Sequence, residues 1–124
     1  MTNFMLVAAG SALGGAARYG CGLALNGVVP VGLPVATFLV NLAGSAAFGY
    51  LFGRQHAVAL AQPLYLALTT GFLGGFTTYS TFNAELVRMA MANEWGRVAG
   101  YAMATMVACF VGGWFGFLIG NRGG

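Results

Sequence analysis

The 124-residue sequence predicts an all-α integral membrane protein with four transmembrane helices, and three observations lead to this. Hydrophobic residues make up 59% of the chain and charged residues only 6%, whereas a soluble domain carries about 25% charged residues. A spanning helix needs roughly 20 apolar residues, so the chain has room for about four. The 21 glycines suit close helix packing in lipid. We therefore expect a single four-helix transmembrane domain over residues 1–124, and no enzyme.

The first two spans are expected at about residues 3–25 and 35–52. Glycine and proline mark residues 26–34, between these spans, as a loop. After the second span, residues 54–56 (Arg, Gln and His) are expected to form a short polar connection. We interpret His56 as a solvated loop residue because no second metal ligand lies near it.

The third span, at about residues 60–91, is too long for one straight crossing of a membrane. Its middle holds the run GGFTTYSTF at residues 74–82. Glycine weakens helix interiors, and Thr and Ser compete for backbone hydrogen bonds, so we expect the helix to break at residues 74–79. Irregular backbone at membrane depth is tolerated only where it is buried in protein or lines a polar cavity. The run is therefore a candidate ion or substrate site. The fourth span is expected at about residues 98–119.

The charged residues are few and evenly divided. Five scattered arginines give a net charge of +3 without a basic cluster, so nucleic-acid binding has no support. With four spans, Arg54 and Arg122 lie on one side of the membrane, and Arg88 and Arg97 on the other. Because Lys and Arg in loops set orientation, this balance favours dual topology, in which two opposed copies pair. The alternative is that the first helix alone sets the orientation.

Polar side chains recur at every fourth residue in two of the spans. They are Thr37, Asn41 and Ser45 in the second span, and Tyr101, Thr105 and Cys109 in the fourth. Each set lies on one helical face. One interpretation is ordinary hydrogen bonding between helices, at about 1 kcal/mol per contact. The other is a pathway lined by neutral donors and aromatic ring edges, which suits a small anion. These residues alone do not name the anion.

Glycine pairs at four-residue spacing, such as Gly71 and Gly75, predict close packing faces. Arg18 and Glu85 are the charged residues inside the expected spans. Intramembrane charge is expensive and is usually functional or paired. For both residues a water-filled vestibule and snorkelling to the interface remain alternatives.

Three motifs give the chain a resemblance to a known family. GGAARY at residues 14–19, VNLAGS at 40–45 and GFLGGFTTYSTFNAE at 71–85 follow one another in order. With these motifs the sequence resembles the small fluoride-channel family, called Fluc or CrcB. The resemblance implies an antiparallel, dual-topology homodimer that crosses the bacterial inner membrane several times. Such proteins conduct fluoride passively, which exports it from the cytoplasm and reduces its toxicity.

The resemblance also implies roles for individual residues. Asn41 matches a pore-facing asparagine, and Tyr79 and Phe82 match two aromatic residues that line the fluoride path. The backbone carbonyls of Gly74 and Thr77 match those that hold a central, structural sodium ion, which is not transported. The other donors expected along the path are Thr37, Ser80, Thr81, Tyr101 and Thr105. Tyr79 departs from the usual phenylalanine, and Cys109, in the polar track of the last helix, departs from a more typical hydroxyl residue.

Two rival functions fit a protein of this size. A small, dual-topology, proton-coupled multidrug exporter needs an acid in the middle of the first span, where this sequence has none. A helper subunit of a larger membrane complex would not need a broken helix beside two aligned rows of donors. We therefore expect a fluoride channel, with fluoride, the lipid bilayer and a second copy of the chain as its partners and sodium as its cofactor.

Overall fold

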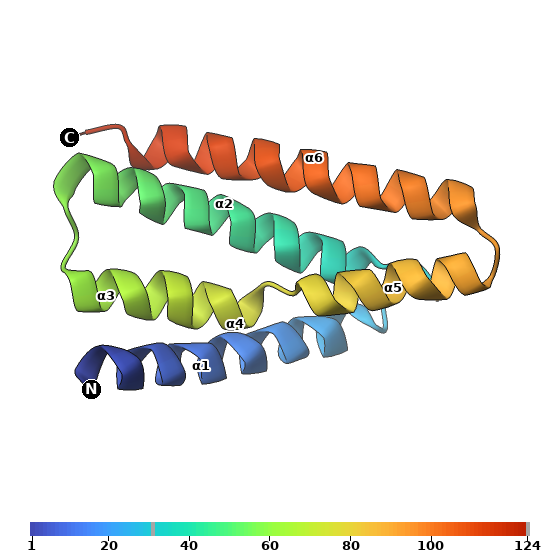
Figure 1. Cartoon of the computed structure of the whole chain (residues 1–124), viewed down its shortest axis with the longest axis horizontal. Helices are drawn as coiled ribbons and strands as arrows, with labels where there is room; N and C mark the ends of the chain where they lie inside the picture. Colours follow the sequence, from blue (N-terminus) through green and yellow to red (C-terminus); the bar gives the residue numbers. More distant parts are fainter. Residues whose placement is uncertain (31, 124) are drawn as a thin grey trace.

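Four long helical segments run back and forth along one axis (Figure 1). The structure is a computed structural model that describes residues 1–30 and 32–123. Three segments are single helices: α1 (Thr2–Leu25), α2 (Val35–Val58) and α6 (Trp95–Gly120). The third segment consists of α3 (Gln62–Leu66), the π-helix η1 (Ala67–Leu73), α4 (Gly74–Phe76) and α5 (Tyr79–Met91). The described residues contain no strand, which confirms the all-helical class.

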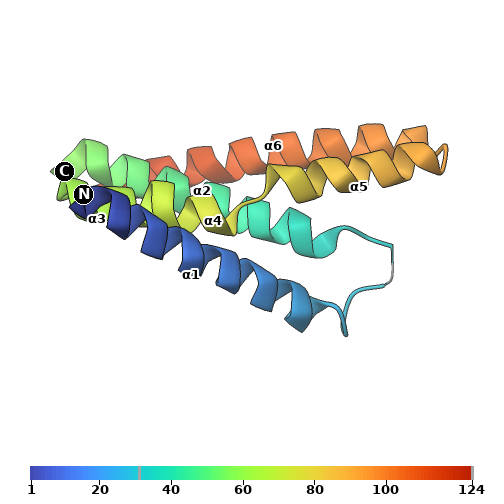
Figure 2. The same ribbon diagram turned by 60° about the horizontal axis from the view of Figure 1, so that its bottom comes forward.

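The helices form two close pairs, and the third segment belongs to both. α2 packs along α6, while α1 packs along η1 and α4 (Figures 1 and 2). After the break that follows α4, α5 leaves α1 and packs against α6. Both chain termini lie at the same end as the connection from α2 to α3 (Figure 1). The break is therefore the point at which the third segment passes from one helix pair to the other.

Glycine explains how closely the helices of each pair approach. A Cβ atom at Gly75 would overlap the backbone carbonyl of Ser11, and one at Gly116 would overlap that of Ala46. The same crowding against a backbone oxygen is found at Gly10, Gly14, Gly49, Gly53 and Gly120. Because only glycine permits such contacts, the close packing expected from the glycine spacings is confirmed, and Gly49 and Gly53 add contacts with α6 that the spacings did not predict.

Replacement of Gly116 by alanine is expected to destabilise the α2–α6 pair. The added methyl group meets backbone that cannot move aside, and overpacking of this kind lowers the free energy of unfolding by about 1–3 kcal/mol. Gly100, on the same helix, is the matched control, because a Cβ atom added there would meet no other atom within 4 Å. The measurement is the melting temperature of each variant in detergent. Equal melting temperatures for Gly116→Ala and Gly100→Ala would contradict the packing described here.

The end of α2 differs from the sequence expectation. Arg54, Gln55 and His56 are helical, so the expected polar connection is wrong, and α2 continues to Val58. The helix ends at Ala59, whose φ of 50° is left-handed. The His56 ring stands edge-on to Phe117 with 6.3 Å between ring centroids, so His56 is not a loop residue. Polar side chains at a helix end do not stop the helix, whereas a left-handed residue does.

The surface of the protein is strongly apolar. α2 and α6 are long and apolar enough to cross a membrane, with mean hydropathies of 1.6 and 1.9. Large apolar side chains point outward on all the long helices, for example Phe4 and Phe110 at 77% and 73% exposure. The buried hydrophobic side chains of the described residues are Val40, Leu73, Phe82 and Met89. This surface fits lipid or a second protein better than water. Four spans remain a prediction.

Candidate functional site

The third segment is interrupted at Thr77 and Thr78. Both residues are extended, with φ and ψ of −76° and 151° at Thr77 and −144° and 112° at Thr78. The Thr78 side chain then caps α5 by accepting a hydrogen bond from the Thr81 N–H at 3.2 Å. Gly74 and Gly75 remain helical, so the break is narrower than the expected residues 74–79. Because Gly75 has no Cβ atom, the Ser11 carbonyl of α1 packs closely against it. Gly75 does not itself break the helix.

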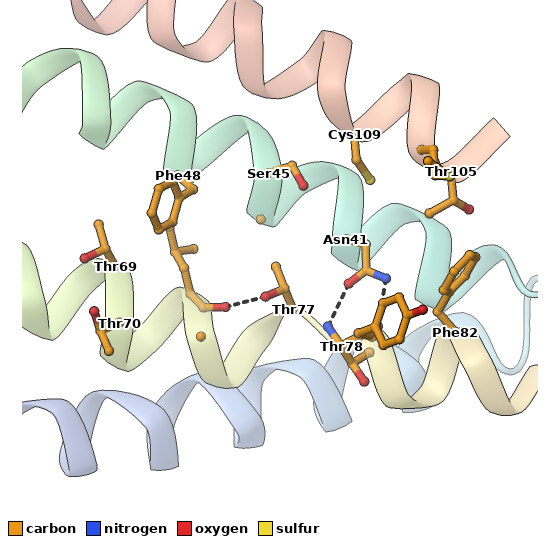
Figure 3. A pocket seen from close by; sticks show the side chains of 15 residues that line it. Asn41, Ser45, Phe48, Thr69, Thr70, Thr77, Thr78, Phe82, Thr105 and Cys109 are labelled. Atoms are coloured by element: carbon orange, nitrogen blue, oxygen red, sulfur yellow. Dashed lines mark hydrogen bonds between the residues drawn. The ribbon is translucent and has the colours of Figure 1, made fainter. Parts of the chain in front are cut away.

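Asn41 of α2 holds the break from across the bundle (Figure 3). Its Oδ1 accepts a hydrogen bond from the Thr78 N–H at 2.7 Å, and its Nδ2 donates to the Thr78 carbonyl at 3.0 Å. The amide thus pairs with both backbone groups of one residue. An amide nitrogen carries two hydrogens, so one Nδ2 hydrogen remains for a further acceptor.

The backbone carbonyls of residues 74–77 lose their helical donors at the break. In a continuous α-helix the Gly74 carbonyl accepts from the Thr78 N–H, and the Thr77 carbonyl from the Thr81 N–H. Here these N–H groups donate to Asn41 Oδ1 and Thr78 Oγ1. The Gly75 carbonyl, by contrast, accepts from Arg18 Nε at 3.3 Å. The Gly74 and Thr77 carbonyls are therefore among those left without a helical donor at the break, and hard alkali cations accept ligands of this kind.

A groove of about 680 Å³ lies beside the break. Gly74, Thr77 and Thr78 form its wall on the third segment, and Asn41 and Ser45 form its wall on α2. The other expected pathway residues that line it are Tyr79, Phe82 and Thr105, together with Cys109 (Figure 3). The groove thus brings together half of the side chains that were expected along the pathway, and both of the expected carbonyls.

The Phe82 ring, which lines this groove, lies close to two tyrosine rings. Phe82 is 7% exposed, and its ring centroid lies 5.1 Å from that of Tyr101 and 5.8 Å from that of Tyr79. The Phe82 and Tyr101 rings cross at 61°, so the edge of one ring faces the other. Tyr79 is 77% exposed and lies at the open mouth of the groove. Phe82 is therefore the aromatic side chain that is held inside the protein.

The hydroxyl group of Thr105 has no hydrogen-bond partner within the described residues. Thr105 is 7% exposed, and its Oγ1 is buried. A buried hydroxyl without a partner is unfavourable by about 1–3 kcal/mol, so such groups ordinarily find an acceptor. Thr105 itself is one of the residues that line the groove, together with Phe82 and Asn41.

The Glu85 carboxylate lies among the hydroxyl side chains that were expected to line the pathway. Its carboxylate accepts hydrogen bonds from the Thr37 hydroxyl of α2 and the Tyr101 hydroxyl of α6, both at 2.7 Å. Glu85 also lines a cavity of about 320 Å³ with Arg88, Glu94 and Arg97. The sequence shows this charge but not its partners. Thr37 and Tyr101 therefore belong to a carboxylate cluster beside the groove and do not line the groove itself.

The remaining expected residues lie on the opposite side of the break. Thr37, Thr78 and Thr81 line a second cavity of about 230 Å³, which also includes Arg18. Ser80 is exposed, and its Oγ is 3.3 Å from Thr78 Oγ1. Thr78 lines both cavities. Thr78 was not among the expected pathway residues; its place in the hydroxyl run TTYST was the available signal.

Comparison with known proteins assigns this arrangement to one family. The family model described as CrcB-like protein, Camphor Resistance (CrcB), matches residues 5–117. A protein of Bordetella petrii named fluoride-specific ion channel FluC is 47% identical over 110 residues, which are 85% of this chain and 80% of that protein. Proteins of the same name from Aromatoleum aromaticum and Hyphomonas neptunium are each 40% identical, over 92% of this chain and 87% and 94% of theirs.

Proposed function

This chain belongs to the CrcB family, and we propose that it is a fluoride-specific ion channel whose pathway runs along the groove beside the broken third segment. It is a membrane protein and not an enzyme. The observation that carries the proposed pathway is the groove itself, which brings together the Asn41 amide, Phe82 and Thr105, a residue whose buried hydroxyl has no hydrogen-bond partner within the described residues. A donor without an acceptor inside a channel protein is a place for the transported anion.

The chemistry of the groove suits a small anion that binds water strongly. Fluoride that leaves water needs hydrogen-bond donors, and the Thr105 hydroxyl and the second Nδ2 hydrogen of Asn41 supply them. The Phe82 ring adds its positive edge. These groups are neutral, so they replace part of the hydration shell without trapping the ion, as conduction requires. Tyr79 borders the groove, whereas Ser80, Thr81, Thr37 and Tyr101 lie outside it and would line a continuation of the path beyond the break.

Conduction through such a path is passive. The channel lets fluoride leave the cytoplasm down its electrochemical gradient after HF has entered the cell and dissociated. The protein is then a multi-pass protein of the bacterial inner membrane. The test is the growth of fluoride-sensitive bacteria that lack their own channel. Expression of this chain is expected to restore growth in fluoride, and no gain in resistance from a protein that reaches the membrane would count against the function.

A second copy of the chain completes the groove. Tyr79 is 77% exposed and Gly74 is exposed, although both border the proposed pathway. An antiparallel partner would cover this face. The arginines support this orientation. Arg54 lies near the end of α2 and Arg122 follows α6, whereas Arg88 lies near the end of α5 and Arg97 near the start of α6. The first two helix ends lie at one end of the molecule, and the last two at the other (Figure 1). This balance gives neither orientation an advantage during insertion.

Dual topology is tested with a cysteine appended to the C-terminus of a variant in which Cys21 and Cys109 are replaced by serine. A membrane-impermeant thiol reagent is expected to label about half of the protein in intact cells, because the two orientations are equally favoured. Labelling of permeabilised cells gives the total amount of protein that carries the cysteine. Labelling of all or none of the protein in intact cells would show a single orientation and exclude the antiparallel dimer.

The same dimer brings two pairs of free carbonyls together. If the twofold axis passes the break, the Gly74 and Thr77 oxygens of both copies surround one position, which suits a structural sodium ion. Exchange of sodium for a large organic cation is therefore expected to weaken the dimer. A ligand at about 100 times its dissociation constant stabilises the folded state by about 2.7 kcal/mol. The measurement is the melting temperature in each salt, and an unchanged value would argue against the ion.

A further inference from the structure

The Asn41 side chain takes over a hydrogen bond that would otherwise lie within the backbone of the third segment. Without a break, the Thr78 N–H would donate to the Gly74 carbonyl, four residues earlier. In this protein it donates to Asn41 Oδ1 at 2.7 Å, while Asn41 Nδ2 donates to the Thr78 carbonyl at 3.0 Å. Asn41 is on α2, 37 residues away in the chain. The Gly74 carbonyl thus lacks its helical donor because a side chain from another helix binds that donor.

We propose that Asn41 is a positioning residue for the cation site, which it creates by keeping the Gly74 carbonyl free. This inference rests on the central sodium site of the proposed function and adds to it the residue that controls the site. Asn41 does not itself touch the ion. It acts through the Thr78 peptide, whose N–H it holds away from Gly74.

Thr78 performs the same task for the other carbonyl. Its Oγ1 accepts from the Thr81 N–H at 3.2 Å, and that N–H would otherwise donate to the Thr77 carbonyl. Thr78 Oγ1 in turn donates to Thr81 Oγ1 at 3.1 Å, which fixes the hydroxyl in place. Asn41 and Thr78 therefore act in series: the amide fixes the Thr78 peptide, and the Thr78 hydroxyl caps α5. Each leaves one backbone oxygen without its helical donor.

The hydrogen bonds from Asn41 to Thr78 are needed because the Thr78 N–H has another acceptor within the backbone. Thr78 is buried, and a buried N–H group that loses its acceptor must find another. The nearest helical acceptor is the Gly74 carbonyl, and propagation of a helix by one residue adds one hydrogen bond. When Asn41 Oδ1 is removed, we expect α4 to extend through Thr78 and to close the Gly74 oxygen to a cation.

The same amide also belongs to the fluoride path. Asn41 uses Oδ1 and one Nδ2 hydrogen on Thr78, and its second Nδ2 hydrogen remains for the anion. The two tasks use different atoms, so they can be separated by substitution. Asn41→Asp keeps an acceptor for the Thr78 N–H but loses the donor. In Asn41→Leu the side chain keeps a similar volume but loses both the acceptor for the Thr78 N–H and the donor for the anion.

The test compares sodium dependence among variants, with stability and not flux as the readout. Melting temperatures of the purified dimer are measured as sodium replaces N-methylglucamine at constant ionic strength. For the unaltered protein, Asn41→Asp and Phe82→Ile, we expect the melting temperature to rise with sodium and to saturate. For Asn41→Leu we expect the half-saturating sodium concentration to increase by about tenfold or more, or the response to vanish.

Each result separates the inference from the function on which it rests. A sodium response in Asn41→Leu equal to that of the unaltered protein would overturn the positioning role while leaving the sodium site intact. No sodium response in the unaltered protein would reject the sodium site, and the positioning role with it. If Asn41→Leu does not fold, Thr78→Val decides, because it removes the cap that frees the Thr77 carbonyl. It too is expected to need more sodium, and an unaltered sodium requirement would overturn the inference.

Discussion

Replacement of Asn41 by aspartate is expected to lower fluoride efflux by about a thousandfold. A carboxylate cannot donate to the passing anion, and it places a negative charge beside it. At about 4 Å and an effective dielectric constant of about 20, two like charges repel by about 4 kcal/mol. A barrier raised by this amount slows passage by about three orders of magnitude. The measurement is fluoride efflux from liposomes that contain equal amounts of each protein.

The control for Asn41→Asp is Asn3→Asp, which makes the same chemical change on α1. Asn3 is exposed in the first turn of that helix and lines none of the cavities described above. A carboxylate near a helix N-terminus is tolerated, so this variant is expected to conduct like the unaltered protein. A folded Asn41→Asp variant that conducts as well as Asn3→Asp would place Asn41 outside the pathway.

Replacement of Phe82 by isoleucine is expected to lower fluoride efflux by about ten- to a hundredfold. Isoleucine fills most of the buried space of Phe82 but has no ring edge to present to the anion. A contact with a charged group contributes about 1.5–3 kcal/mol, which corresponds to that range of rates. The same efflux assay measures the effect, and elution on size exclusion shows whether the proposed dimer is kept.

Phe4→Ile serves as the control for Phe82→Ile. Phe4 is 77% exposed on α1 and borders none of the cavities described above. The same loss of ring area at this position is expected to leave efflux unchanged. If Phe82→Ile and Phe4→Ile conduct equally well, the Phe82 ring packs the bundle and does not bind the anion.

The sequence predicted the fold class because the composition of a membrane protein leaves few alternatives. The glycine spacings also predicted which helix faces pack closely, and Gly75 against Ser11 is one such contact. The position of the break was harder to predict. The pair Gly74 and Gly75 suggests a helix break, but both residues stay helical and Gly75 serves helix packing. The backbone opens two residues later, at Thr77 and Thr78.

The partners of the polar residues could not be predicted from local pattern. The four-residue spacing placed Asn41 on a face with Thr37 and Ser45, but it could not show that Asn41 pairs with Thr78, 37 residues away. Likewise Glu85 was visible as a charge within a span, but its bonds to Thr37 and Tyr101 arise only when three helices meet. Such contacts are set by tertiary packing, on which residue spacing carries no information.

The central claim is that this protein forms a fluoride-selective path without the help of any other protein. The most direct measurement is ion efflux from liposomes that contain only this purified protein, with fluoride or chloride as the internal anion and valinomycin to carry potassium. We expect rapid loss of fluoride and no loss of chloride above that of empty liposomes. Equal efflux of the two anions, or no efflux of fluoride from liposomes shown to contain the folded protein, would contradict the claim.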